Sequence, residues 1–224
     1  MNPPFRIRSQ ETQKVKYMTR IVPVFLGLTA AASMAHAQAG PVFAYFGGGS
    51  AYASSNGQQI DTFGDGNLYS TPKLNGTFLN FGAGIMFTDH FGAGGQLSWR
   101  ATQGDYAGLK YRPLFYNFDG IWEPVKSKRF TPELRAGIGG VSVRYYYNQR
   151  YCDQFAGCST SNQYLESSRH FQVHFALAAR IHITDHVFVR PAIDAHYVNN
   201  FFQFGSNWVP EYNIGIGYSL GGSE

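Results

Sequence analysis

The chain has 224 residues, of which 14% are charged and 17% are aromatic, and its formal net charge is +4. This length allows one domain with a sizeable core, and the composition excludes an intrinsically disordered chain. No apolar run long enough for a transmembrane helix follows the N-terminal region, which argues against a membrane protein built from α-helices.

The first predicted element is an export signal. A cation precedes an apolar stretch, and Ala35 and Ala37 supply the small residues that a signal peptidase recognises. We expect a signal peptide over residues 1–37, with Met18 as an alternative start, and a mature domain over residues 38–224. The signal holds five cations and one acid, so the mature chain holds thirteen of each sign. The excess positive charge therefore belongs to the signal and does not indicate a nucleic-acid partner.

Eight segments of the mature chain alternate apolar residues with small or polar ones. A period of two is typical of β-strands with one apolar face. In the fifth segment we expect a β-bulge at Gly139–Gly140, because it would keep Ile138 and Val141 on one face. The predicted strands span residues 42–53, 77–87, 91–101, 111–122, 130–147, 168–183, 187–198 and 210–220.

The connections alternate between short and long. Thr88–His90 and Thr184–His186 repeat the tripeptide Thr-Asp-His, whose side chains can hydrogen-bond nearby backbone and favour a tight turn. Residues 123–129 form the third short connection, and the other four are longer. Short turns at one end and long loops at the other, on an even number of strands behind an export signal, are typical of an outer-membrane barrel.

An alternating barrel can also be a soluble ligand-binding protein, but three features favour the membrane. No lysine lies well inside a predicted strand, and the polar faces are dense in glycines, as the inside of a narrow barrel requires. Aromatic residues gather at strand ends, as in the interfacial girdles of membrane barrels. The predicted girdle contains Phe87, Phe91, Trp99, Tyr111, Trp122, Tyr197, Tyr212 and Tyr218.

This architecture, the opening strand VFAYFGGGSAYA and the closing strand YNIGIGYSL resemble the small outer-membrane β-barrel proteins, a group that includes the OmpA transmembrane domain and OmpX. The resemblance covers the mature chain and implies an all-β fold, an eight-stranded antiparallel up-and-down transmembrane β-barrel in the outer membrane of a Gram-negative-type envelope. We also expect contact with outer-membrane lipid and lipopolysaccharide, insertion by the barrel-insertion machinery, and a monomer. Such proteins usually end on an aromatic residue, whereas GGSE follows Leu220 here, and Tyr218 is the candidate substitute.

The inward faces of the predicted strands carry eight charged residues. Opposite charges in a narrow barrel should pair, because an unpaired buried charge is costly. The interior of an eight-stranded barrel is just wide enough for side chains, so a packed lumen is favoured over the alternative of a narrow ion-conducting pore. The predicted lumen network contains Arg100, Asp119, Glu133, Arg135, Arg180, Arg190, Asp194 and Glu211.

No sequence motif identifies a catalytic, metal or cofactor site. His170 and His174 share a face but lie about 13 Å apart along a strand, too far to bind one ion. A lipid A deacylase, another eight-stranded outer-membrane barrel, is an alternative by analogy, but it requires a His-Ser dyad. His196 has no neighbouring serine, and the alternation places it inside the barrel. We therefore expect a protein that is not an enzyme and needs no cofactor or metal.

The four long loops are rich in Tyr, Asn, Gly, Ser and Phe, and loops on a rigid scaffold commonly carry function. They favour a structural or surface-recognition role toward an extracellular ligand of unknown identity. Cys152 and Cys158 are the only cysteines, and export places them in an oxidising compartment. An even pair in one loop predicts a disulfide within residues 148–167.

Overall fold

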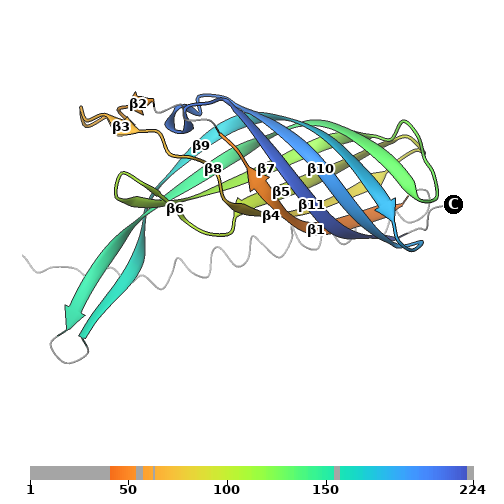
Figure 1. Cartoon of the computed structure of the whole chain (residues 1–224). Helices are drawn as coiled ribbons and strands as arrows, with labels where there is room; N and C mark the ends of the chain where they lie inside the picture. Colours follow the sequence, from red (N-terminus) through yellow and green to blue (C-terminus); the bar gives the residue numbers. More distant parts are fainter. Residues whose placement is uncertain (1–40, 54–57, 63, 154–156, 221–224) are drawn as a thin grey trace, which may run out of the picture. The chain divides into compact units, whose positions relative to one another are not determined.

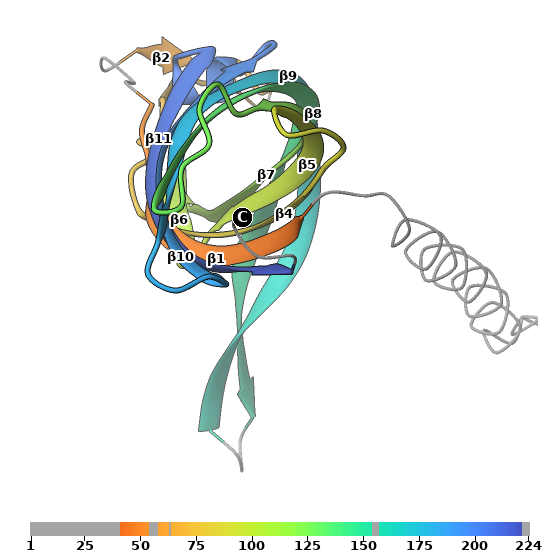
Figure 2. The same ribbon diagram turned by 90° about the vertical axis from the view of Figure 1, so that its right-hand side faces the viewer.

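The computed structural model describes residues 41–53, 58–62, 64–153 and 157–220. The expected cleavage site at Ala35 and Ala37 and the C-terminal GGSE lie outside the described residues. Within them, eight long strands form one closed antiparallel ring, in which β1 (Val42–Ala51) pairs with the last strand, β11 (Trp208–Leu220) (Figure 1). Figure 2 looks along the axis of this ring.

The other six strands of the ring also lie where the alternation predicted them, which confirms the eight-stranded fold. In chain order they are β4 (Thr77–Met86), β5 (Phe91–Arg100), β7 (Leu109–Trp122), β8 (Phe130–Asp153), β9 (Gly157–His182) and β10 (Val187–Val198).

Short elements occupy the long connections. β2 (Gln59–Ile60) pairs with β3 (Tyr69–Ser70), and β6 (Gly104–Tyr106) pairs with the start of β7. The 3-10 helix η2 (Phe202–Phe204) lies between β10 and β11. None of the helices in the described part of the chain has the length and apolarity needed to cross a membrane.

The two Thr-Asp-His turns form the same hydrogen bonds. In each, the threonine Oγ1 accepts from the backbone N–H three residues later, at 3.0 Å. The histidine Nδ1 then reaches a backbone carbonyl of the adjacent strand end, Glu123 for His90 at 2.8 Å and Ser219 for His186 at 3.1 Å. The repeated tripeptide is therefore a structural turn that ties one hairpin to the next strand of the ring.

The prediction of a β-bulge at Gly139–Gly140 is wrong. β8 stays in register with β7 through both glycines, so its odd-numbered residues face the lumen along the whole ring. Val141 and Val143 are buried inside, whereas Ile138 faces outward and is 59% exposed. The alternation misled because the lumen is apolar at this level, which places apolar residues on both faces of the strand.

The outer surface of the ring is apolar and carries aromatic residues near both ends. Phe87, Phe91 and Trp122 are exposed at the end of the short turns, and Tyr212 is exposed toward the other end. Tyr111 was wrongly assigned to this girdle. It is 1% exposed, because it lies on the inward face of β7 and donates to the Lys73 carbonyl at 2.7 Å.

β8 and β9 continue beyond the ring as a two-stranded hairpin, which we call the arm (residues 146–153 and 157–165; Figure 1). The expected loop over residues 148–167 is therefore mostly strand. The register shifts by one residue between Tyr145 and Tyr146, which leaves Leu165 without an opposite residue on β8. Beyond this point the two strands pair as far as Asp153 and Gly157. A β-bulge of this kind bends the ribbon and increases its twist where it leaves the ring.

Candidate functional site

The interior of the ring is filled by two apolar clusters with a polar layer between them. The lower cluster, at the end of the short turns, consists of Phe43, Tyr45, Met86, Ile121 and Phe188. The upper cluster lies at the end of the arm. It contains the buried residues Ala51, Ala53, Leu74, Phe78, Tyr106, Tyr111, Phe115, Val141, Val143, Tyr145, Val198, Phe201, Phe204 and Val209.

Glycines on the inward face make room for these rings. A Cβ added at Gly82 would collide with the Tyr45 ring, and one added at Gly84 would collide with Phe43. The small residues of β4 therefore allow two aromatic side chains of β1 to lie across the narrow lumen. This arrangement agrees with an interior just wide enough for side chains.

Glu133 on β8 is the centre of an ionic cluster beside the lower apolar cluster. Its Oε2 accepts from Arg135 at 2.9 Å and from Arg190 at 3.1 Å, and its Oε1 lies 2.6 Å from Arg180 Nε. Arg180 also pairs with Glu123, the residue that follows β7. Because three guanidinium groups surround one carboxylate, loss of Glu133 would leave buried positive charge without its main partner.

Aromatic rings of the lower cluster hold the same guanidinium groups from the other side. Arg180 lies 4.4 Å above the Phe43 ring and Arg190 lies 4.4 Å above the Tyr45 ring. Such cation–π contacts stabilise a desolvated guanidinium. Arg135 also donates to the Tyr45 hydroxyl at 3.4 Å, so the ionic and lower apolar clusters form one packed unit.

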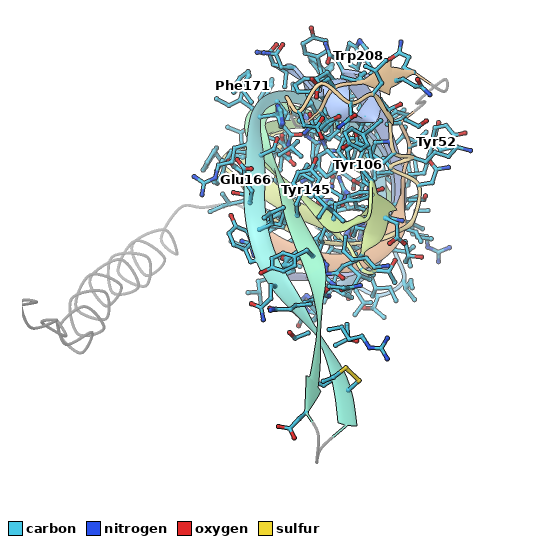
Figure 3. The ribbon with its side chains drawn as sticks, turned by 90° about the vertical axis from the view of Figure 1, so that its left-hand side faces the viewer. Tyr52, Tyr106, Tyr145, Glu166, Phe171 and Trp208 are labelled. Atoms are coloured by element: carbon cyan, nitrogen blue, oxygen red, sulfur yellow. A yellow bond between two sulfur atoms is a disulfide. The ribbon has the colours of Figure 1, made fainter. Side chains whose placement is uncertain are left out.

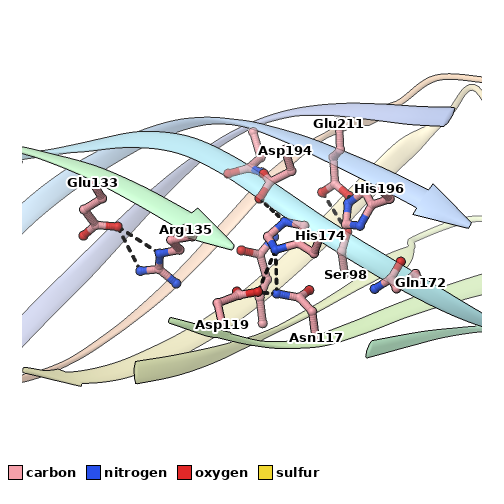
Figure 4. A network of polar contacts seen from close by, with 12 residues as sticks. Ser98, Asn117, Asp119, Glu133, Arg135, Gln172, His174, Asp194, His196 and Glu211 are labelled. Atoms are coloured by element: carbon pink, nitrogen blue, oxygen red, sulfur yellow. Dashed lines mark hydrogen bonds and ion pairs between the residues drawn. The ribbon is translucent and has the colours of Figure 1, made fainter. Parts of the chain in front are cut away.

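His174 on β9 lies between two carboxylates in the middle of the lumen (Figure 4). Its Nδ1 is 2.8 Å from Asp119 Oδ1, and its Nε2 is 2.9 Å from Asp194 Oδ1. A carboxylate only accepts hydrogen bonds, so both contacts are satisfied together when both ring nitrogens carry protons. The imidazole thereby joins β7, β9 and β10 through charge-assisted hydrogen bonds.

His196 on β10 lies beside His174, with 4.8 Å between the ring centroids. Its Nε2 is 3.6 Å from Glu211, whose other oxygen accepts from Ser98 at 2.7 Å. Five carboxylates and three guanidinium groups are buried in the described lumen. The buried carboxylates therefore outnumber the buried guanidinium groups by two.

The structure brings seven of the eight predicted lumen charges together inside the ring. They are at most 4% exposed and comprise Asp119, Glu133, Arg135, Arg180, Arg190, Asp194 and Glu211. Arg100 is separate and only partly buried at the upper cluster. It donates to the Tyr111 hydroxyl at 2.8 Å and lies 5.2 Å above that ring, so its partner is an aromatic residue rather than a carboxylate.

Sequence reasoning missed the His174–His196 pair and the role of Glu123. A usable signal for the histidines was the turn between β9 and β10, where Ile183 N–H donates to the Val187 carbonyl. Counting away from this pair along both strands brings His174 opposite His196. Glu123 was assigned to a connection, and its buried side chain depends on Arg180 from a distant strand.

One Ser–His contact lies at the end of the arm. Ser168 and His170 on β9 contact each other, and Gln203 donates to Ser168 Oγ at 3.0 Å. Ser168 and Gln203 line a small pocket with Tyr145, a residue of the upper cluster, so the pair faces the mouth of the lumen and not the lipid side. Among the described residues, no group of three or more His, Cys, Asp or Glu side chains could hold a metal ion.

The predicted disulfide is present. It joins Cys152 and Cys158, which are directly opposite each other in the arm (Figure 3). The bond closes the hairpin near its tip.

Comparisons with known proteins identify the same architecture. The sequence matches the family described as outer membrane protein beta-barrel domain over residues 24–220. Neisserial surface protein A matches with a TM-score of 0.52 and 12% identity, over 80% of this chain and 98% of that one. Ail, the attachment invasion locus protein of Yersinia pestis, in complex with the heparin analogue sucrose octasulfate, matches with a TM-score of 0.50 and 11% identity, over 81% of this chain and 99% of that one. No curated protein matches the sequence.

A closed antiparallel ring that satisfies its own backbone hydrogen bonds and presents an apolar outer surface is a transmembrane β-barrel. The chain belongs to the outer membrane protein beta-barrel domain family, and its place is the cell outer membrane. The two solved structures share the fold with this chain, and at these identities they show the fold alone.

We expect the short turns to face the periplasm and the arm to face the outside, because outer-membrane barrels have short periplasmic turns and longer extracellular loops. Trypsin added to intact cells should cleave at Arg150 in the arm, if anywhere, and leave Lys126 and Lys128 uncut. Arg169 should also stay uncut, because it is paired with Ser142 within the ring. Mass spectrometry of the released peptides reads out the result. Cleavage confined to the two lysines would reverse the orientation.

Proposed function

We propose that this barrel is not an enzyme and that it works from its outer surface, as a sealed scaffold that presents the arm to an extracellular protein. The observation that carries this proposal is the continuation of β8 and β9 beyond the ring as paired strands joined by a disulfide (Figure 3). A hairpin held in one shape loses little conformational entropy on binding, which favours affinity.

The surface of the arm is polar and aromatic. Tyr147, Tyr164 and Leu165 are 39%, 57% and 51% exposed, and most of their neighbours are Asn, Gln, Ser and Thr. Tyrosines supply a large contact area at a low entropic cost, and small amide and hydroxyl side chains supply adaptable hydrogen bonds, as in binding loops that recognise proteins. Ail, a barrel of the same fold, is named as an attachment invasion locus protein, which is compatible with a surface role on this scaffold.

The two alternative functions receive less support. A pore needs a continuous wet path, and the upper cluster places fourteen buried apolar residues across the mouth of the lumen. A lipid A deacylase needs its serine and histidine at the lipid surface. His196 is fully buried in the lumen, and the Ser168–His170 pair lies on the inward face of β9.

The test is binding by the full-length barrel in nanodiscs to a panel of immobilised extracellular-matrix and serum proteins. Replacing both Tyr147 and Tyr164 by serine should weaken binding about tenfold or more, as expected when two exposed aromatic anchors are lost. Tyr52→Ser is the matched control, because Tyr52 is 52% exposed and follows β1 rather than lying in the arm. Equal binding by the arm variant, or no binding above empty nanodiscs, would contradict the proposal.

Replacing Cys152 by serine should loosen the arm and leave the ring unchanged. Closing so small a loop contributes about 2–2.5 kcal/mol in the chain-entropy account, and this energy acts on the arm alone. We expect faster proteolysis within residues 148–167, with unchanged heat-dependent gel mobility of the folded barrel. Cys158→Ser should behave identically. Alkylation of two thiols in the wild-type protein without reductant would contradict the disulfide.

A further inference from the structure

Three arginines lie side by side on the outer face of the ring, at the end of the arm. Arg112 of β7 is directly opposite Arg144 of β8. Arg169 of β9 is opposite Ser142, which is two residues before Arg144 on the same face of β8. All three arginines are exposed, and we call them the arginine cluster. The register of three neighbouring strands thus brings together residues that are far apart in the sequence.

No carboxylate neutralises the arginine cluster in the part of the chain that the structure describes. Two acids on the same strands or their connections have other surroundings: Asp105 pairs with Lys110 at 2.5 Å, and Glu166 is opposite Tyr145 on the lumen face of the hairpin. Like charges directly opposite each other on adjacent strands destabilise a sheet. A bound anion that accepts from two guanidinium forks would remove this repulsion, and phosphate matches their geometry.

The depth of the cluster fits the headgroup region of the outer leaflet. Outward-facing positions of β8 from Phe130 to Gly140 carry no charge. This stretch rises about 33 Å along the strand, or about 25 Å across the membrane once a tilt of about 40° is included, which is the height of the apolar band of such barrels. Ser142 and Arg144 follow immediately, so the arginine cluster begins where the hydrocarbon ends.

Apolar residues support the cluster from below. One step toward the membrane the outward residues are Tyr116, Gly140 and Phe171, and the next step has Phe118, Ile138 and Val173. Figure 3 shows Phe171 on the outside of the barrel. Acyl chains would pack against these residues while the phosphate stays at the arginines.

The cluster is confined to one side of the barrel. On the strands of the ring that do not carry the cluster, the exposed residues near the same end include the aromatic side chains of Tyr52, Tyr197, Trp208 and Tyr212. A general belt of cations would surround the barrel evenly, whereas three arginines on three neighbouring strands form a localised site with apolar surface directly beneath it.

We infer that Arg112, Arg144 and Arg169 bind the phosphate groups of a lipopolysaccharide molecule in the outer leaflet. Each guanidinium group donates two parallel hydrogen bonds to phosphate oxygens. The side chains of Ser142 and Ser167, in the same two rows of the sheet, lie within the site. The site orients the side of the barrel beneath the arm toward lipid A, and it does not depend on a ligand of the arm.

Native mass spectrometry of the full-length barrel in a non-ionic detergent, titrated with diphosphoryl lipid A, tests this inference. The triple variant Arg112→Gln, Arg144→Gln and Arg169→Gln should bind about tenfold more weakly or worse, since each cation near an anionic headgroup contributes substantially. Arg129→Gln, the same change near the short turns, is the matched control and should bind like the wild type. Arg144→Lys should bind more tightly than Arg144→Gln and more weakly than the wild type, because lysine keeps the positive charge but lacks the paired donors of a guanidinium group.

The triple variant removes like charges, so its thermal stability without lipid A should equal or exceed that of the wild type, and the single variant Arg144→Gln serves if the triple variant folds poorly. A lipid A analogue without phosphates should bind the wild type as weakly as diphosphoryl lipid A binds the triple variant. The inference would be overturned if the wild type bound both lipids equally well. It would also be overturned if the triple variant bound diphosphoryl lipid A as tightly as the wild type does. If inorganic phosphate bound as tightly as lipid A, the site would recognise free phosphate, and the assignment of a lipid ligand would be wrong.

Discussion

Replacing Glu133 by glutamine should destabilise the folded barrel by about 3–5 kcal/mol, the usual cost of leaving a buried charge without its partner. Glu133 is fully buried and contacts Arg135, Arg180 and Arg190. A neutral amide removes the charge that these three guanidinium groups share and leaves Glu123 as the remaining carboxylate of the cluster. Urea unfolding from lipid vesicles, followed by tryptophan fluorescence, measures the loss.

Two further variants separate this charge effect from a general loss of packing. Glu166→Gln changes an exposed carboxylate at the base of the arm and should alter stability by no more than about 0.5 kcal/mol. The double variant Glu133→Gln with Arg135→Gln should be less destabilised than the sum of the single variants, by at least about 0.5 kcal/mol, because the two residues interact. A loss at Glu133→Gln no larger than at Glu166→Gln would contradict the assigned cluster.

Replacing Leu177 by arginine should cost about 2–4 kcal/mol of folding free energy in lipid, the penalty of a cation at the bilayer midplane. Leu177 lies on the outward face of β9 and is 56% exposed. The same unfolding measurement applies. A Leu177→Arg barrel as stable as the wild type would show that this face does not contact hydrocarbon.

The matched control for depth is Ile183→Arg, six residues along the same face. Ile183 is 66% exposed beside the second Thr-Asp-His turn, where a cation should cost only about 0–1 kcal/mol. Ala178→Arg tests the other face. Ala178 is 5% exposed in the lumen, opposite Glu133, and an arginine there should overpack the interior at a cost of about 1–3 kcal/mol.

The sequence predicted the strands well, because lipid outside and packed side chains inside impose a period of two. β8 shows where this reasoning fails. The rule assumes that the lumen is polar, whereas Val141 and Val143 point into an apolar cluster at the mouth. The continuous register of β8 with β7 decides the face of these residues, and no local pattern contains that information.

The sequence could predict which charged residues of the site face the lumen, because that depends on the alternation within a single strand. Alternation placed Asp119, Glu133 and Asp194 inside, but the clusters that they form depend on register across several strands. His174 meets Asp119 from β7 and Asp194 from β10 only after the ring closes. The arm escaped prediction for a different reason: Tyr, Asn, Ser and Gln occur equally in loops and in solvated hairpins, so composition alone did not reveal the strand pairing.

The central claim is that the lumen is sealed and that function lies on the outer surface. Planar-bilayer recording of the refolded full-length barrel tests it most directly, with a general porin in the same bilayer as a control for sensitivity. The upper cluster, the polar layer around His174 and the ionic cluster lie one after another along the lumen, so we predict no discrete current steps at voltages at which the porin conducts. Steady, reproducible steps that disappear when the folded protein is omitted would contradict it.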